Sequence, residues 1–92
     1  MSQNLFISYD LMSPGQDYNS VQEAIKRLGP WVKFQYSMFY VNTKLSVDEA
    51  YNFVRLHLDP NDKLAVIQAH GGMVDHCDQP VIDAVNEIWF TP

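Results

Sequence analysis

The sequence has little cysteine and no long apolar run. Its single cysteine, Cys77, cannot form a disulfide within the chain, which fits a protein of the reducing cytoplasm. No stretch approaches the roughly 18 apolar residues that a membrane-spanning helix needs. The first residues lack the basic and apolar segments of a secretory signal. We therefore expect a cytoplasmic protein that has no membrane partner.

Basic residues are also scarce. Six Lys and Arg residues stand against eleven Asp and Glu residues, which gives a net charge of -5. Proteins that bind nucleic acids in general usually present a basic surface, because neutralisation of phosphates drives their affinity. The only adjacent basic pair is Lys26-Arg27. This balance disfavours a general nucleic-acid binder, although a local basic patch could still form in the fold or across a dimer.

The motifs of several enzyme classes are missing as well. The chain has no glycine-rich phosphate loop, no C-x-x-C pair and no H-E-x-x-H helix. Side chains of the types that bind Zn²⁺ do occur close together, namely His70, Asp75, His76, Cys77 and Asp78. Their spacing matches neither of those metal-binding patterns, and a polar loop collects such residues anyway. We therefore interpret this segment as a solvated loop rather than a metal site.

What the chain does have is a set of β-prone segments. Hydrophobic residues make up 47% of the 92 residues, which is enough for the core of one domain. Apolar alternation predicts a strand over residues 5–10. One face of that strand carries Leu5, Ile7 and Tyr9. Residues 31–43 are too long for one strand, so we expect two strands that reverse near residues 35–37. Another strand is expected over residues 63–69.

Helical spacing of apolar residues predicts three helices. The first covers residues 17–28 and is ended by a Gly-Pro pair. The second begins at Ser46 and Glu49, which have the spacing of a capping box. Its buried stripe is expected to contain Val47, Ala50, Tyr51, Val54 and Leu58. The third begins at about Gln79.

The order of these elements predicts the fold. We expect a single α/β (α+β) domain over residues 1–92, with a ferredoxin-like βαββαβ sandwich over residues 1–69 and a loop and added C-terminal helix over residues 70–92. Right-handed crossovers would place both crossover helices on one sheet face. The other face would carry residues from the set Phe6, Phe34, Phe39 and Val41, or else the residues that alternate with these along the strands. An apolar face implies a partner. We expect the C-terminal helix to cover part of it and a second copy, in a homodimer formed through the sheet, to cover the rest.

Three short motifs follow one another along residues 4–69. The first strand ends in Tyr-Asp at Asp10, the middle hairpin carries Q-x-S-x-F around Ser37, and D-x-h-x-h begins at Asp62, where h is apolar. In this order and spacing the chain resembles the family of CRISPR-associated protein 2 and the virulence-associated protein D toxins. It resembles the small SinR-like proteins more closely still.

The resemblance implies a ferredoxin-like dimer in which the Asp at the end of the first strand faces its symmetry mate. In active members of that family this Asp pair holds a divalent metal ion for phosphodiester cleavage. It therefore implies Asp10 as a catalytic residue and as the ligand of Mg²⁺ or Mn²⁺, with Ser37 as a second catalytic candidate. Carboxylates suit these hard ions. From the residues alone, Asp10 could instead accept backbone N–H groups in the turn after the strand.

Three functions stay open. The negative charge, and the absence of basic residues from positions 11–25, favour a non-catalytic dimeric scaffold or binding protein, whose partner could be another protein. The motif match favours a metal-dependent endonuclease, such as a toxin-like endoribonuclease, that cleaves RNA or DNA with Asp10. The third is an acidic inhibitor that presents carboxylates to a nucleic-acid-binding protein where phosphates would lie. Aromatic residues of the middle hairpin could also stack bases, but we favour packing in the core and in a dimer interface.

Overall fold

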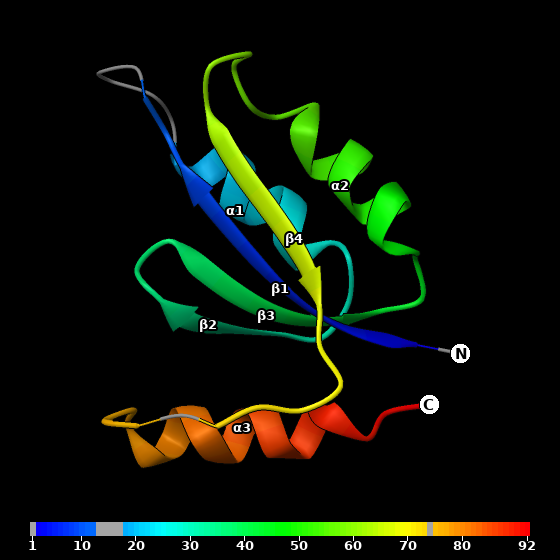
Figure 1. Ribbon diagram of the computed structural model, residues 1–92, viewed down its shortest axis with the longest axis vertical. Helices are drawn as coiled ribbons and strands as arrows, with labels where there is room; N and C mark the ends of the chain where they lie inside the picture. Colours follow the sequence, from blue (N-terminus) through cyan, green and yellow to red (C-terminus); the bar gives the residue numbers. More distant parts are fainter. Residues whose placement is uncertain (1, 13–17, 74) are drawn as a thin grey trace.

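The computed structural model describes residues 2–12, 18–73 and 75–92 and shows an α+β domain built on one four-stranded antiparallel sheet (Figure 1). The strands are β1 (Gln3–Asp10), β2 (Trp31–Gln35), β3 (Met38–Thr43) and β4 (Lys63–Gln68). The helices are α1 (Tyr18–Lys26), α2 (Val47–Arg55) and α3 (Gln79–Trp89). The chain runs β1, α1, β2, β3, α2, β4, α3, and the strands lie in the order β2-β3-β1-β4.

Backbone hydrogen bonds fix which neighbour each strand residue faces. The N–H of Tyr9 donates to the carbonyl of Ser37 at 3.1 Å, and the N–H of Ala69 donates to the carbonyl of Asn4 at 2.9 Å. Hydrogen-bonded positions alternate along an antiparallel pair. The odd-numbered residues of β1 therefore bond to β3 and the even-numbered ones to β4. In β4, the backbone N–H and C=O groups of the odd-numbered residues point toward β1. Those of the even-numbered residues therefore point toward the open edge of the sheet.

One face of the sheet and helices α1 and α2 enclose the core. The predicted face of β1 is confirmed, because all three of its residues are buried: Leu5, Ile7 and Tyr9. The register places Phe39 opposite Ile7 on the same side of the sheet. From the helices, the buried residues are Val21, Ala24 and Ile25 of α1 and Ala50 and Val54 of α2.

Local signals set the ends of the helices. The predicted capping box is present: the N–H of Glu49 donates to Ser46 Oγ at 3.1 Å, and the N–H of Ser46 donates to Glu49 Oε1 at 2.9 Å. Between α1 and β2 the backbone of Gly29 has a φ of 157°. A Cβ at this position would lie 2.0 Å from the carbonyl oxygen of Asn42. The chain can enter β2 against β3 only because this residue is glycine.

Several predicted details differ from the structure. The two-residue reversal after Gln35 puts Phe39 in the core, together with Val41, instead of on the face of Phe6 and Phe34. Tyr51 is 40% exposed, because the buried side of α2 is centred on Ala50 and Val54. Helix α1 ends at Lys26 rather than at residue 28, and its predicted start at residue 17 lies outside the described residues.

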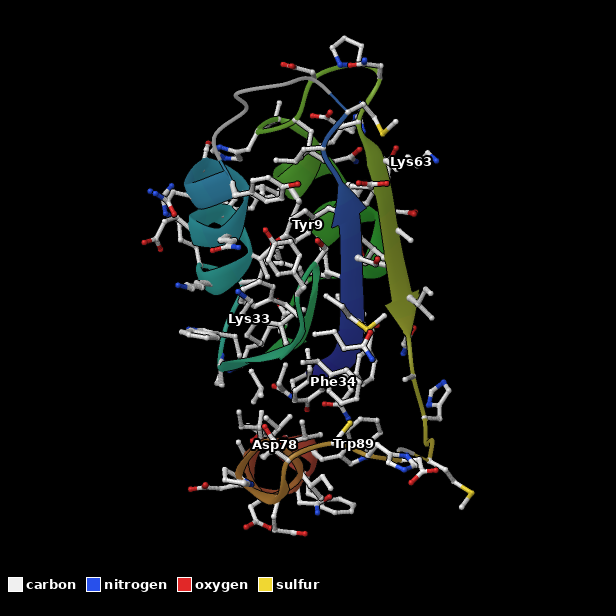
Figure 2. All side chains as sticks on the ribbon, turned by 90° about the vertical axis from the view of Figure 1, so that its left-hand side faces the viewer. Tyr9, Lys33, Phe34, Lys63, Asp78 and Trp89 are labelled. Atoms are coloured by element: carbon white, nitrogen blue, oxygen red, sulfur yellow. The ribbon has the colours of Figure 1, made fainter. Side chains whose placement is uncertain are left out.

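Helix α3 lies across the second sheet face, beside β2 and β3 (Figures 1 and 2). Its Trp89 ring stacks on Tyr40, with centroids 5.6 Å apart and planes 19° apart. Asn4 joins the helix to the sheet: its Nδ2 donates to the carbonyl of Trp89 at 3.0 Å, and its Oδ1 accepts from the Tyr40 hydroxyl at 2.5 Å and from Asn42 Nδ2 at 3.0 Å. No residue of α3 is fully buried, so the helix covers the second face only in part.

Candidate functional site

Asp10 and Ser37 lie at the same end of the sheet. Asp10 ends β1, and Ser37 lies in the turn between β2 and β3, where its carbonyl accepts the N–H of Tyr9. Asp10 is exposed and Ser37 is half-buried. Within residues 2–12, 18–73 and 75–92, neither side chain takes part in a hydrogen bond or an ion pair. The sheet therefore brings the two predicted site residues into one region but does not join their side chains.

The residue directly across from Asp10 is a cation. The antiparallel register places Lys63 of β4 opposite Asp10, and directly opposed residues have Cβ atoms about 5 Å apart. The lysine on the neighbouring strand brings a positive charge near Asp10, and this charge disfavours the binding of a divalent cation at the carboxylate. The described part of the chain contains no group of three or more His, Cys, Asp or Glu side chains that could hold a metal ion. A Mg²⁺ or Mn²⁺ site at Asp10 would therefore need ligands from water or from a second copy.

A different carboxylate, that of Asp62, binds the backbone near this end of the sheet. Asp62 is only 5% exposed, and its two oxygens accept the N–H of Met12 at 2.9 Å and the N–H of Asp59 at 2.8 Å. Arg55 donates to the carbonyls of Asp62 and Asp59 at 2.8 and 2.6 Å. Asp62 thus ties the chain after β1 to the turn before β4. This is the backbone-binding role considered for Asp10, and the sequence pattern did not assign it to Asp62.

The polar loop between β4 and α3 does not gather its ligand-type side chains into a metal site in the described region. His76 Nδ1 lies 3.1 Å from Asp75 Oδ1, and both side chains are about nine-tenths exposed. Cys77 is a half-buried free thiol. Asp78 occupies the N-cap position of α3, but its side chain makes no capping hydrogen bond. His70, Asp75, His76 and Asp78 are thus all exposed to solvent.

The aromatic residues of the hairpin are distributed over different surfaces. Phe39 and Tyr40 are buried, and Phe34 contacts Phe6 edge to face with centroids 5.4 Å apart. Tyr36 is 76% exposed, and its ring lies 5.5 Å from the ammonium group of Lys33. Since these rings do not share one open face, they do not build a flat platform for stacking bases. Packing therefore accounts for most of these aromatic residues better than base stacking does.

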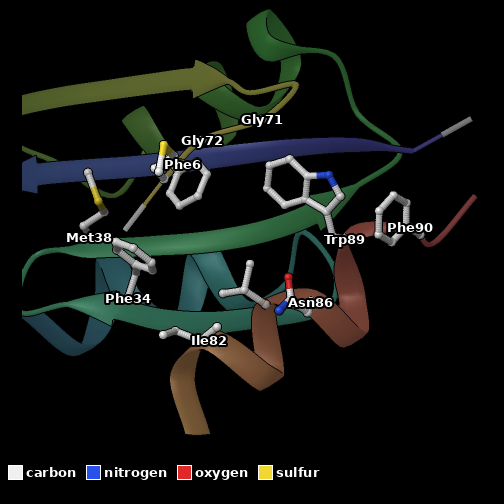
Figure 3. A pocket seen from close by; sticks show the side chains of 11 residues that line it. Phe6, Phe34, Met38, Gly71, Gly72, Ile82, Asn86, Trp89 and Phe90 are labelled. Carbon is white, nitrogen blue, oxygen red and sulfur yellow. The ribbon is translucent and has the colours of Figure 1, made fainter. Parts of the chain in front are cut away.

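A groove of about 470 Å³ opens between α3 and the second sheet face (Figure 3). Phe6, Phe34 and Met38 come from the sheet, and Ile82 and Trp89 come from α3. The lining is mostly apolar, and at its rim Phe90 and Met73 are 85% and 98% exposed. An apolar hollow that stays open to water is typical of a binding surface. The sequence predicted a partly covered face but not this groove. The apolar stripe of the C-terminal helix is the sequence feature that could have indicated it.

Burial changes the acidity of one side chain near the groove. Loss of hydration raises the pKa of Tyr40 to about 12, although a side-chain hydrogen bond with Asn42 opposes the shift. The neutral Tyr40 phenol donates its hydrogen bond to Asn4 Oδ1. The role is structural, because it fixes the strand on which α3 stacks.

No helix among the described residues is long and apolar enough to cross a membrane. Comparison of the chain with models of known protein families, with curated proteins and with solved structures finds no match.

Proposed function

We propose that this protein is a non-catalytic homodimeric scaffold or binding protein with a ferredoxin-like sandwich similar to that of CRISPR-associated protein 2 and virulence-associated protein D. The observation that carries the proposal is the apolar groove beside α3. Its sheet residues Phe6, Phe34 and Met38 are half-buried in a single chain, and Phe90 at its rim is almost fully exposed. Apolar surface of this kind is stabilised when a partner covers it.

The element order and the strand order β2-β3-β1-β4 support the ferredoxin-like part of the proposal. The uncovered part of the sheet supports the dimer, because Ile67 of β4 is 55% exposed on the same face as Phe6, its register partner in β1. A second copy that packs against this β4 side of the sheet would remove part of the exposed Ile67 side chain from water. The dimer would then present two grooves to further partners.

The surroundings of Asp10 support the non-catalytic part. Lys63 opposes the binding of a divalent ion, and the buried carboxylate nearby, Asp62, already accepts two backbone N–H groups. The acidic balance of the chain, with a net charge of -5, also opposes the approach of a nucleic acid.

The test combines cleavage with mass in solution. Labelled RNA and DNA are incubated with the protein and Mg²⁺ or Mn²⁺, using wild type, Asp10→Ala and the matched control Asp48→Ala, an exposed carboxylate in the first turn of α2. Sedimentation equilibrium on the same preparations gives the oligomeric state. We expect a dimer and no cleavage above background by any of the three. Cleavage that Asp10→Ala abolishes and Asp48→Ala keeps would refute the non-catalytic assignment.

A metal-dependent endonuclease is the second candidate, and one observation favours it. The carboxylate of Asp10 is exposed and forms no ion pair or hydrogen bond with the described residues, so none of these residues gives it a structural role. Asp10 also lies on the sheet face of Phe6, since both are even-numbered residues of β1. A dimer through that face would bring two Asp10 carboxylates toward each other, and an ion shared between them could activate water for attack on a phosphate.

A further inference from the structure

The two edges of the sheet differ in how they are protected. Figure 1 shows β2 at one border and β4 at the other. Proline, lysine and bulges are the usual devices that keep an edge strand from pairing with another chain. The β2 edge has all three: Pro30 precedes it, Lys33 lies in its middle, and the register shifts between Lys33 and Gln35. Strand β4 has a regular register and no charge after Lys63.

The backbone groups at the β4 edge are open. Because Ala69 and the other odd-numbered residues bond to β1, the N–H and C=O groups that point outward belong to Leu64, Val66 and Gln68. None of the turn, cap or side-chain hydrogen bonds found in the described residues uses these groups. A row of unpaired backbone donors and acceptors is a template for a further strand.

The segment is complementary to a second copy of itself. In an antiparallel pair centred on Val66, Val66 faces Val66 of the second copy, and Leu64 faces its Gln68. This register uses every outward backbone group of β4 and keeps residues of one sheet face together. On the second face Ala65 lies opposite Ile67 of the second copy, and this contact would shield part of the 55% exposed Ile67 side chain. The two Lys63 ammonium groups fall at opposite ends, so like charges do not meet.

We propose that two copies of the chain join edge to edge through β4, in antiparallel register centred on Val66, to form one continuous sheet. This inference rests on the proposed homodimer and names its interface. It gives the two-fold axis a definite place, next to the Val66 backbone. The grooves beside α3 stay free in this arrangement, because α3 lies over β2 and β3, away from the β4 edge.

The register is tested by disulfide trapping in a Cys77→Ser background, since Cys77 is the native cysteine. Ala65 and Ile67 of the second copy form a non-hydrogen-bonded pair with Cα atoms about 4.5 Å apart, which suits a disulfide. The double variant Ala65→Cys/Ile67→Cys should become a covalent dimer under mild oxidation. Ala65→Cys alone and Ile67→Cys alone should stay monomeric in denaturing electrophoresis, because each would need a shifted register. Crosslinking by a single variant, or none by the double variant, would overturn the proposal.

Proline at position 68 tests the same interface without a crosslink. The N–H of Gln68 points outward, so Gln68→Pro removes an interface donor and leaves the β1–β4 hydrogen bonds in place, whereas Gln68→Ala keeps the donor. We expect Gln68→Pro to raise the dimer dissociation constant roughly tenfold or more and Gln68→Ala to change it about twofold or less. Circular dichroism checks that both variants fold. Equal dissociation constants would refute the edge pairing.

Failure of this inference differs from failure of the proposed function. A wild-type protein that sediments as a dimer but gives no trapped 65–67 pair refutes the β4 edge and leaves the homodimer intact. A wild-type protein that sediments as a monomer at all concentrations refutes both.

Discussion

Replacing Asp62 by asparagine should strongly destabilise the fold, and the same replacement of Asp10 should not. Each oxygen of the Asp62 carboxylate accepts a different backbone N–H, those of Met12 and Asp59, and the residue is 5% exposed. In the Asp62→Asn variant an amide NH₂ would face one of these donors, so one partly buried N–H loses its acceptor and the other N–H loses a charged acceptor. Hydrogen bonds to charged groups contribute about 1.5–3 kcal/mol each, so we expect a loss of about 2–4 kcal/mol.

Asp10 provides the matched comparison. Its carboxylate is exposed and bonds to none of the described residues, so Asp10→Asn should change the free energy of unfolding by less than about 0.5 kcal/mol. Urea denaturation followed by far-ultraviolet circular dichroism measures both variants. For a domain of this size, the Asp62→Asn loss corresponds to a fall in Tm of roughly 10–30 °C. If Asp10→Asn costs as much as Asp62→Asn, the assignment of the structural role to Asp62 is wrong.

The packing of the domain leads to three further predictions. Gly29→Ala should cost more than about 2 kcal/mol in urea denaturation, because its Cβ would meet the Asn42 carbonyl oxygen at 2.0 Å; a loss below about 0.5 kcal/mol would contradict this close approach. Trp89→Ala should detach α3 from the sheet. In hydrogen exchange the amides of α3 should then lose their protection while those of β1 keep theirs, and protection that persists in α3 would contradict this prediction. Burial raises the Tyr40 pKa to about 12, above its ordinary 10.0, so the neutral phenol stabilises the fold below about pH 10 and this contribution disappears as the pH rises through about 12. Tyr40→Phe should abolish that part of the alkaline loss of stability, and an unchanged profile would refute the assignment.

Short-range signals in the sequence predicted the elements well. Ser46 and Glu49 are three residues apart, and a capping box needs nothing from the rest of the chain. The alternation in β1 likewise identified its buried face. The reversal between β2 and β3 was placed correctly, but the face of Phe39 was not. Its face depends on the length of the turn, because a shift of one residue moves every side chain to the opposite side of the sheet.

Features that depend on distant parts of the chain were harder to predict. The sequence places Asp62 in an acidic turn, but its bond to the N–H of Met12 forms only when the end of β1 meets that turn. The position of α3 is similar, since an apolar stripe shows that a helix is covered but not by which surface. Asp10 and Ser37 lie at one end of the sheet, yet no local pattern indicated that Lys63 would lie opposite Asp10.

The closeness of the two chain ends has a practical consequence. Ser2 Oγ donates to the carbonyl of Thr91 at 2.5 Å, and Figure 1 shows both ends side by side. A short linker could therefore join them, and the chain could be reopened between the exposed residues Gly71 and Gly72. In this circular permutant α3 would precede β1 and be tethered directly to it. If the permutant folds with Trp89 still stacked on Tyr40, the packing of α3 on the sheet does not depend on the connection between β4 and α3.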